Sequence, residues 1–503
     1  MLPKSCGTSW ARTTSCSGFV KFDAAIILPE CTNSEGITPD MIDPRVAGGL
    51  RDLPPSASIP RERMLDCFRK SFASFGFLPI ETPHIERMEV LTGKGAGSEE
   101  VLRQIFEVNN KGGKLGELAL RFDLTVPLAR FIAKHVHELG IPFKRYAIGS
   151  VFRGESPGKG RFREFTQCDF DTVGTESVVA DAETAAVIYD ALASAGVPKF
   201  TISLNNRKVL DGFLDMIGAS DRVGGVLRAL DKLAKIGRAR VLEELSGAET
   251  IDPDPDKPPR VALLSVTQAE RLLAFVEGGR GDGDEVLSRA ASELGTNPRA
   301  AEGLANLREV WRILMSAGVP RASARIDLGL ARGLDYYTGV VYETTVDGWE
   351  RFGSIASGGR YDDLASLFTE RRLPGVGASI GLDRLLALLE ESGGLGRSSS
   401  PAPVLVTQSA GVDAAVSMAI AVRLRRAGIG AEVFPDPIAT GKQMAYGSSR
   451  GHRFGLIVGP DEAEAQTFRL RDLATRKELK AIAWVNLESS VAEALQFQPT
   501  SPS

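Results

Sequence analysis

Cysteine is scarce in this chain, which has five cysteines among its 503 residues. They stand at positions 6, 16, 31, 67 and 168, without the paired spacing of a zinc site or a disulfide framework. The four histidines form no cluster with carboxylates, and only the pair at 135 and 137 would share a face if that segment were extended. We therefore expect no dedicated metal site, a reducing compartment and, most simply, a cytoplasmic location.

Long apolar runs are also missing. No stretch of about 18 apolar residues occurs, so we expect no segment that crosses a membrane. The net charge of −4 provides no bulk positive field, and any binding of RNA must therefore rest on local basic patches. The length is sufficient for about three domains.

The N-terminal segment has no acidic residue before Asp23, whereas Lys4, Arg12 and Lys21 precede it. Together with many Ser, Thr and Cys residues, this is weakly typical of an organellar import sequence. A start codon placed too far upstream or a disordered tail explains the segment equally well. We expect residues 1–44 to be a disordered extension and ordered structure to begin near Arg45.

Residues 144–171 are expected to form a hairpin with a Ser/Pro/Gly/Lys turn at 156–160. Because strand side chains alternate, the second strand should present one polar face, made of Arg163, Phe165, Gln167, Asp169 and Asp171. Arg153 and Glu155 should share a face of the first strand. Guanidinium groups suit phosphate and carboxylates suit an amine, so the hairpin fits a zwitterionic substrate beside a nucleotide. A solvated edge hairpin is the structural alternative.

The order of residues in this hairpin indicates a particular protein family more specifically than its charge pattern does. Phe-Arg-x-Glu is followed by Gly-Arg-x-Arg-Glu-Phe-x-Gln and by Asp-Phe-Asp. This succession resembles the second signature of class II aminoacyl-tRNA synthetases, in the form found in the histidyl-tRNA synthetase family.

Segments before the hairpin resemble the same family. We expect a helix after Pro60 that ends at Gly76, followed by a strand over residues 77–85 that contains Pro83. Together they resemble the first signature, which builds a dimer interface in the family, although a core helix and an edge strand give the same periodicity. After a strand expected over 104–108, residues 121–127 (Arg-Phe-Asp-Leu-Thr-Val-Pro) resemble the eukaryote-type branch of the loop that binds the α-amino group. Asp123 or Thr125 could also simply cap the following helix.

Three further motifs follow the hairpin. Residues 331–339 (Ala-Arg-Gly-Leu-Asp-Tyr-Tyr-Thr-Gly) and residues 357–364 resemble two peptides that are specific to histidyl-tRNA synthetases. Residues 375–386 resemble the third class II signature, a strand running into a helix, where Arg384 is suited to phosphate. Packing tyrosines and a glycine turn are the structural alternatives for the first two motifs.

The resemblance implies a class II antiparallel-sheet catalytic domain with a helical insertion, together with an α/β anticodon-binding domain. We expect an α/β (α+β) chain with these boundaries: extension 1–44, catalytic domain 45–207 and 322–391, helical insertion 208–321, linker 392–403, anticodon-binding domain 404–493 and tail 494–503.

The resemblance also implies the activity, which is ligation of L-histidine to tRNA(His) through histidyl-adenylate, with ATP as substrate, Mg²⁺ on its phosphates and a homodimer as the assembly. The implied residues for ATP are Arg153, Glu155, Arg161, Phe165 and Arg384. Those implied for histidine are Asp123, Thr125, Gln167, Asp171, Arg332, Tyr336, Tyr337 and Tyr361, and Arg153 and Arg332 are the implied catalytic cations.

Two alternatives remain open on the sequence. A synthetase for threonine, proline or glycine would share the three signatures but should lack the peptide at 331–339. A regulatory subunit of histidine biosynthesis would bind histidine without charging tRNA, but such subunits usually lack the anticodon-binding domain and lose phosphate-binding arginines.

Overall fold

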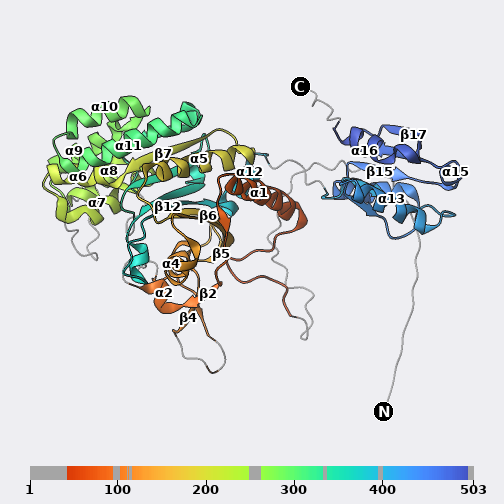
Figure 1. Ribbon diagram of the computed structural model, residues 1–503, viewed down its shortest axis with the longest axis horizontal. Coiled ribbons are helices and arrows are strands. Elements are labelled where there is room, and N and C mark those ends of the chain that lie inside the picture. The colour runs from red at the N-terminus through yellow and green to blue at the C-terminus, as the bar shows by residue number, and fades with distance from the viewer. Residues whose placement is uncertain are drawn as a thin grey trace, which may run out of the picture. The chain divides into compact units, whose positions relative to one another are not determined.

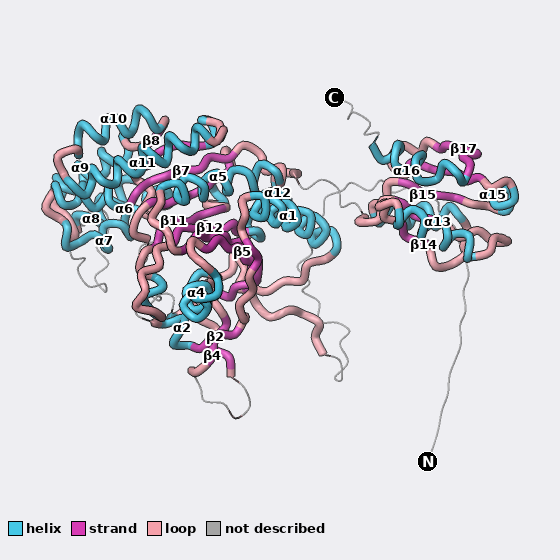
Figure 2. The backbone as a smooth tube through the Cα atoms, viewed as in Figure 1, coloured by secondary structure: helices cyan, strands magenta, loops and turns pink. Residues whose placement is uncertain are grey.

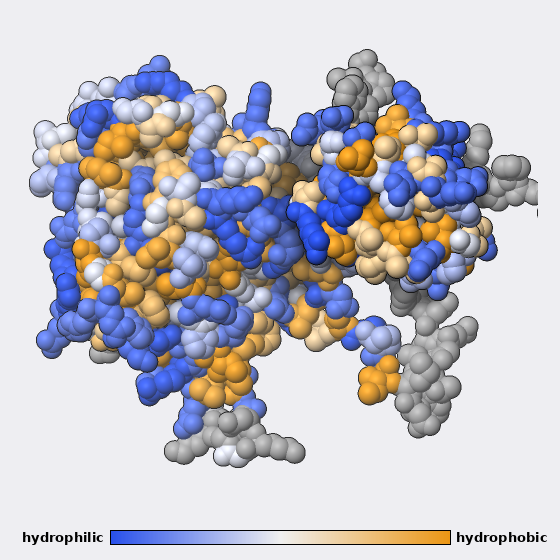
Figure 3. Space-filling model, turned by 45° about the vertical axis from the view of Figure 1, so that its right-hand side comes forward, coloured by the Kyte–Doolittle hydropathy of each residue, from blue (hydrophilic) through white to orange (hydrophobic). Residues whose placement is uncertain are grey.

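The computed structural model describes residues 42–93, 102–109, 112, 116–247, 262–331, 337–394 and 400–496. Most of the expected N-terminal extension, part of the linker at 392–403 and the end of the tail therefore lie outside the described residues. Among the described residues, no helix combines the length and the apolar content needed to cross a membrane. On the face seen in Figure 3, hydrophilic and hydrophobic residues are interspersed.

A nine-stranded sheet forms the centre of the N-terminal part, with the order β1-β5-β6-β12-β11-β10-β7-β9-β8 (Figures 1 and 2). Only β1 with β5 and β7 with β9 pair in parallel among these neighbours, and the remaining pairs are antiparallel. The antiparallel catalytic sheet expected from the sequence is thus confirmed. Its strands are β1 Leu78–Pro79, β5 Phe143–Phe152, β6 Glu164–Val173, β7 Phe200–Asn206, β8 Arg280–Gly281, β9 Ala324–Asp327, β10 Val340–Val346, β11 Ala356–Tyr361 and β12 Gly375–Gly381.

One face of this sheet is covered by helices α1 (Pro55–Ser74), α5 (Val178–Ser194) and α12 (Leu382–Glu391) (Figure 1). Cys168 and Phe170 of β6 point into this layer, where the ring of Phe170 lies 5.0 Å from that of Phe72 between centroids. Because side chains alternate along a strand, Gln167 and Asp171 must point to the opposite face. The apolar core therefore determines which side of β6 is left for polar chemistry.

The expected hairpin is formed by β5 and β6, but both strands stop short of the turn at positions where the prediction continued them, while β6 extends to Val173. β5 ends at Phe152 and β6 begins at Glu164, so Arg153, Glu155 and Arg163 lie in the connection between them. The connection is held by other parts of the chain, because Gly154 N donates to Gln104 O at 2.7 Å and Arg163 N donates to Gly49 O at 2.9 Å.

Two of the elements expected before the hairpin were predicted wrongly. Helix α1 begins at Pro55 and contains Pro60, which lacks only one amide donor, while Phe68 and Phe72 bury the stripe that stabilises the helix. The single strand expected over 77–85 is divided into β1 and β2 (Ile85–Arg87), which pair in different sheets. Pro79 and Pro83 cannot donate to a strand ladder, and this favours the division.

A three-stranded sheet, β2-β4-β3, lies beside helices α2 and α4. Its other strands are β3 Glu107–Val108, the short remainder of the strand expected over 104–108, and β4 Leu118–Leu120. The helices are α2 Met88–Thr92 and α4 Thr125–Leu139.

The helical region expected over 208–321 is present and shares one apolar core with the nine-stranded sheet. Its helices are α6 Arg207–Met216, α7 Val223–Leu230, α8 Leu233–Ser246, α9 Val266–Gly278, α10 Gly283–Leu294 and α11 Pro298–Ser316. The exact domain boundaries remain predictions.

The C-terminal part is a small α/β domain with its own apolar core and the strand order β14-β13-β15-β16-β17 (Figure 2). One final strand was expected, whereas the chain forms the antiparallel pair β16 and β17, joined by a turn in which Asp472 accepts from two backbone amides at 2.8 Å. The elements are β13 Val404–Val406, α13 Ala414–Arg426, β14 Ala431–Val433, α14 Thr440–Arg450, β15 Phe454–Ile457, α15 Pro460–Glu464, β16 Thr467–Asp472, β17 Glu478–Ala483 and α16 Leu487–Gln496.

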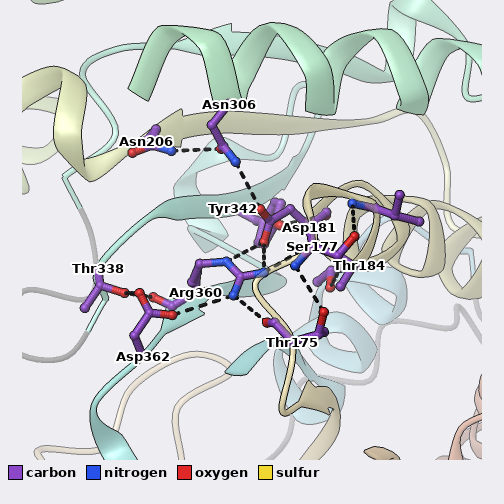
Figure 4. A network of polar contacts seen from close by, with 12 residues as sticks. Thr175, Ser177, Asp181, Thr184, Asn206, Asn306, Thr338, Tyr342, Arg360 and Asp362 are labelled. Atoms are coloured by element: carbon purple, nitrogen blue, oxygen red, sulfur yellow. Dashed lines mark hydrogen bonds and ion pairs between the residues drawn. The ribbon is translucent and has the colours of Figure 1, made fainter. Parts of the chain in front are cut away.

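A buried ion pair connects the helical layer to the nine-stranded sheet (Figure 4). Arg360 of β11 donates from Nε to Asp181 of α5 at 2.8 Å, and the two residues are 7% and 0% exposed. Asn306 of α11 also donates to Asp181, at 3.2 Å, and the hydroxyl of Tyr342 donates to the Asp181 carbonyl at 2.7 Å. Strands β10 and β11 are thus tied to α5 and α11 by one residue, Asp181, through its carboxylate and its backbone carbonyl.

We predict that Asp181→Ala lowers the free energy of unfolding of the full chain by about 3–5 kcal/mol, because it removes the closest charge partner of a buried guanidinium and leaves only Asp362, 3.6 Å away. Urea unfolding measures this. Asp181→Leu combined with Arg360→Met should restore part of the loss. The control is Glu309→Ala, which breaks an exposed pair with Arg312 on α11 and should leave the unfolding midpoint unchanged. An equal midpoint shift in Asp181→Ala and Glu309→Ala would contradict the prediction.

Candidate active site

A cavity of about 540 Å³ opens where the polar face of β6 meets the ends of neighbouring elements. It brings together nearly all the site residues predicted from the sequence. Those that line it are Asp123, Thr125, Arg153, Glu155, Arg161, Phe165, Gln167, Asp171, Tyr337, Tyr361 and Arg384. The two others, Arg332 and Tyr336, lie outside the described residues.

Asp123 serves as a helix cap and also borders the cavity. Its Oδ1 accepts from the backbone amides of Thr125 at 3.1 Å and Val126 at 2.9 Å, which satisfies donors at the start of α4. The capping interpretation and the ligand interpretation are therefore compatible, since Asp123 and Thr125 both line the cavity.

Asp171 is held in place by a guanidinium and a phenol. Arg145 Nη2 lies 2.6 Å from Asp171 Oδ2, and the Tyr361 hydroxyl donates to Asp171 Oδ1 at 2.6 Å. The side chains of Arg145 and Asp171 are 0% and 4% exposed. Burial raises the pKa of Asp171, while the charge of Arg145 and the hydrogen bond from Tyr361 act in the opposite direction.

Arg145 is a site residue that the sequence analysis missed. It lies on β5 directly across from Asp171 on β6, so the register of the hairpin creates the pair. The sequence analysis gave no role to any residue of 144–152, although an arginine at the second position of this segment was the available signal. A buried arginine needs a buried acceptor, and the facing strand carried two aspartates.

Gly377 of β12 allows Asp171 to occupy this position. A Cβ atom at Gly377 would lie 2.1 Å from Asp171 Oδ1 and 2.6 Å from the carbonyl oxygen of Phe170. Any larger residue would therefore displace either the carboxylate or the strand.

Gln167 and Asp169 lie on the same face of β6 as Asp171 and also line the cavity. Gln167 Nε2 donates to Ser379 Oγ at 2.9 Å. This end of the cavity is acidic, with three aspartates (Asp123, Asp169 and Asp171) close to the guanidinium of Arg145. It suits a cationic or donor-rich ligand group.

The opposite end of the cavity is basic and aromatic. Arg153 stacks near two rings, with its Cζ 4.3 Å from the centroid of Phe122 and 5.1 Å from that of Phe165. Arg384, in the first turn of α12, donates to the carbonyl of Ser354 at 2.7 Å. Arg161 is half exposed and lies 3.5 Å from Glu155. Guanidinium groups at a helix start and in a loop suit phosphate groups.

Asp383 fixes the start of α12 beside these arginines, and the sequence analysis gave it no role. Its Oδ2 accepts from Thr166 N at 2.6 Å, and its Oδ1 accepts from Arg51. The pairing joins the third signature to β6 and to the segment before α1.

The two histidine-specific peptides pack against each other. Thr338 N donates to Arg360 O at 2.8 Å, and Thr338 Oγ1 donates to Asp362 at 2.7 Å (Figure 4). A Cβ atom at Gly359 would lie 2.8 Å from the Tyr337 ring, so glycine is needed for that ring to lie in place. The buried pair of Arg360 with Asp181 therefore supports the strand that carries Tyr361. Among the described residues, no group of three or more His, Cys, Asp or Glu side chains could hold a metal ion.

Comparison with known proteins agrees with this geometry. A family model described as histidyl-tRNA synthetase matches residues 49–385, and a model of an anticodon binding domain matches residues 404–494. A protein of Rhodopirellula baltica named histidine–tRNA ligase is 44% identical over 457 residues, covering 91% of this chain and 99% of that protein. One of the same name from Wolinella succinogenes is 43% identical, covering 86% and 94%.

Solved structures give the same result. The crystal structure of histidyl-tRNA synthetase from Nostoc sp. PCC 7120 matches with a TM-score of 0.79 and 35% identity, covering 90% of this chain and all of that one. An ATP phosphoribosyltransferase regulatory subunit/histidyl-tRNA synthetase from Bacillus halodurans shares the fold, with a TM-score of 0.62 and 24% identity. The matched models, the extent of these alignments and the residues gathered in the cavity lead to one conclusion: the chain belongs to the histidyl-tRNA synthetase family.

Proposed function

We propose that this chain is a histidine–tRNA ligase, which activates L-histidine with ATP to histidyl-adenylate and then transfers the histidyl group to the 3′ end of tRNA(His). The observation that carries this proposal is a single cavity with a basic, aromatic end and an acidic end. It is supported by the match of most of the chain to ligases of that name.

In the first step, a carboxylate oxygen of histidine attacks the α-phosphorus of ATP, and the bond to the leaving pyrophosphate breaks. No proton needs to move, so the residues act by positioning and by stabilising negative charge. Arg153 and Arg332 are assigned to the reacting carboxylate and α-phosphate. Arg161 and Arg384 are assigned to the distal phosphates, and Phe165 to stacking on adenine.

Mg²⁺ would arrive on the phosphates of ATP, because it prefers oxygen ligands and usually binds nucleotide phosphates with one or two carboxylates. Glu155 borders the cavity beside Arg161 and is the carboxylate that fits such an ion. The ion would supply charge neutralisation at the phosphates.

Histidine is assigned to the acidic end. Asp123, Thr125 and Gln167 are proposed for the α-amino group, which offers only hydrogen-bond donors. Asp171 and Tyr361 are proposed for the imidazole, whose two nitrogens present one donor and one acceptor.

Tyr336 and Tyr337 are assigned to the same pocket as Asp171. A pocket that pairs both ring nitrogens leaves its own groups unpaired when an isostere binds, and this gives strong discrimination.

In the second step, the terminal ribose hydroxyl of tRNA takes the acyl group from the adenylate. The C-terminal domain is assigned to the anticodon, on the match to an anticodon binding domain. The helical region is assigned to the acceptor arm. A homodimer and a cytoplasmic location are further proposals, made on the family resemblance.

The test is exchange of labelled pyrophosphate into ATP by the purified full chain. Exchange should depend on histidine, should not occur with threonine, proline or glycine, and should be lost in Arg332→Ala. Histidine binding without exchange, in folded wild-type protein, would contradict the ligase and favour a regulatory subunit.

We predict that Tyr361→Phe lowers kcat/KM for histidine by about tenfold to a hundredfold, because it removes a hydrogen bond to a buried carboxylate. The KM for ATP should change little. Pyrophosphate exchange at varied histidine and varied ATP measures both constants. Tyr189→Phe is the control, since this ring packs on Phe200 outside the cavity. An equal effect on both substrates would argue against a role in histidine recognition.

Gly377→Ala should abolish histidine-dependent exchange in a protein that still folds, because its Cβ would displace Asp171. Gly224→Ala is the matched control on α7, where the nearest atom to the new Cβ is 3.8 Å away at a flexible arginine. Circular dichroism establishes folding and pyrophosphate exchange establishes activity. Normal histidine kinetics in Gly377→Ala would show that Asp171 does not require its present position.

A further inference from the structure

A short segment before α1 packs on the connection between β5 and β6. Residues 47–51, which we call the N-terminal strap, contain a turn in which Leu50 N donates to Ala47 O at 3.0 Å. Gly49 is the third residue of this turn, where its φ of +82° favours glycine. A Cβ atom at Gly49 would also lie 2.7 Å from Arg163 Cδ. Glycine is therefore needed both for the turn and for the close approach to Arg163.

Two carbonyl oxygens of the N-terminal strap bind the connection. Gly49 O accepts from Arg163 N at 2.9 Å, and Gly48 O accepts from Arg163 Nη1 at 3.0 Å. Arg163 also donates from Nε to Glu155 O at 3.4 Å, within the connection itself. The same connection carries Arg161, which is assigned to the distal phosphates of ATP. The strap therefore constrains the backbone that positions this arginine.

Arg51 joins the N-terminal strap to two other parts of the chain. Its Cζ lies 3.9 Å from the centroid of the Phe162 ring, which is within the range of a cation–π contact. Its Nη2 is ion-paired to Asp383 Oδ1, and the two side chains are 27% and 7% exposed. Phe162 directly follows Arg161 in the chain, and Asp383 directly precedes Arg384. One guanidinium thus contacts a neighbour of each arginine assigned to the distal phosphates.

The ion pair also sets the charge at the basic end of the cavity. Among the described residues that line the cavity, Asp383 is present and Arg51 is not. A carboxylate without a charge partner would repel the phosphates of a nucleotide, and charges interact more strongly where water is partly excluded. Arg51 therefore neutralises Asp383 from outside the space that a nucleotide needs.

We propose that Arg51 is a positioning residue for ATP, which fixes the spacing of Arg161 and Arg384 and neutralises Asp383 beside the distal phosphates. The inference rests on the proposed function, because it assigns a part in binding ATP to a residue outside the cavity. The contacts of Arg51 lie at the basic end, so histidine binding should not depend on it.

Kinetics of pyrophosphate exchange by the full chain, at varied ATP and varied histidine, test the inference. Arg51→Met keeps an apolar stem that packs on Phe162 but lacks the positive charge. We expect it to raise the KM for ATP by at least about tenfold and the KM for histidine by less than about twofold, since it removes a hydrogen bond between charged groups at the basic end. Arg51→Lys, which keeps the charge, should restore part of the loss. Arg45→Met is the matched control, because Arg45 is ion-paired to Asp43 and its side chain is 84% exposed.

Inhibition by AMP separates positioning from a general loss of structure. AMP carries the adenine and one phosphate, but it has no distal phosphates for Arg161 and Arg384. Its inhibition constant should therefore change by less than about twofold in Arg51→Met. Equal increases for ATP, AMP and histidine would overturn the inference, and so would an unchanged KM for ATP.

A pair of glycine variants tests the N-terminal strap without altering Arg51. Gly49→Ala strains the backbone and displaces Arg163, so it should raise the KM for ATP in the same selective way. Gly76→Ala is its control, because Gly76 has a similar φ of +80° and a Cβ atom there would meet no other described residue within 4 Å. Equal KM values for ATP in the two variants would also overturn the inference. Histidine-dependent exchange by wild-type protein separates the two failures, since its absence would contradict the proposed function itself.

Discussion

Arg145 and Asp171 face each other across β5 and β6, excluded from solvent and 2.6 Å apart. Burying either charge alone would cost several kcal/mol, so each residue requires the other in place. If one strand shifted by one residue, its charged side chain would turn into the apolar layer of α1, α5 and α12 and lose its partner. The register of the hairpin and the position of the cavity are therefore fixed by the same pair.

The rest of the site is arranged around this constraint. Tyr361 reaches Asp171 from β11, and β11 is tied to α5 by the buried pair of Arg360 with Asp181. At the opposite end of the cavity, the arginines come from a loop and from a helix start, where they are partly exposed and can meet phosphate. At the acidic end Asp169 and Asp171 are buried, whereas at the basic end Arg153 and Arg384 are half-buried and Arg161 is exposed.

The sequence predicted the hairpin, the polar face of β6 and eleven of the residues that line the cavity, because sequence motifs and strand alternation are local properties. It did not reveal Arg145, whose partner lies 26 positions away and is chosen by strand register. It also placed the start of α1 after Pro60, whereas the helix begins at Pro55. The helix includes Pro60 because burial of Phe68 and Phe72 outweighs the missing amide donor. These misses share a cause, since each was decided by tertiary packing between segments distant in the sequence.

The most direct test of this arrangement is a crystal structure of the chain with a non-hydrolysable analogue of histidyl-adenylate. We expect the imidazole between Asp171 and Tyr361, the amino group against Asp123 and Gln167, and the phosphate beside Arg153. An analogue bound with its adenine on the acidic face of β6, or with its ring away from Asp171, would contradict the assignment of the two ends of the cavity.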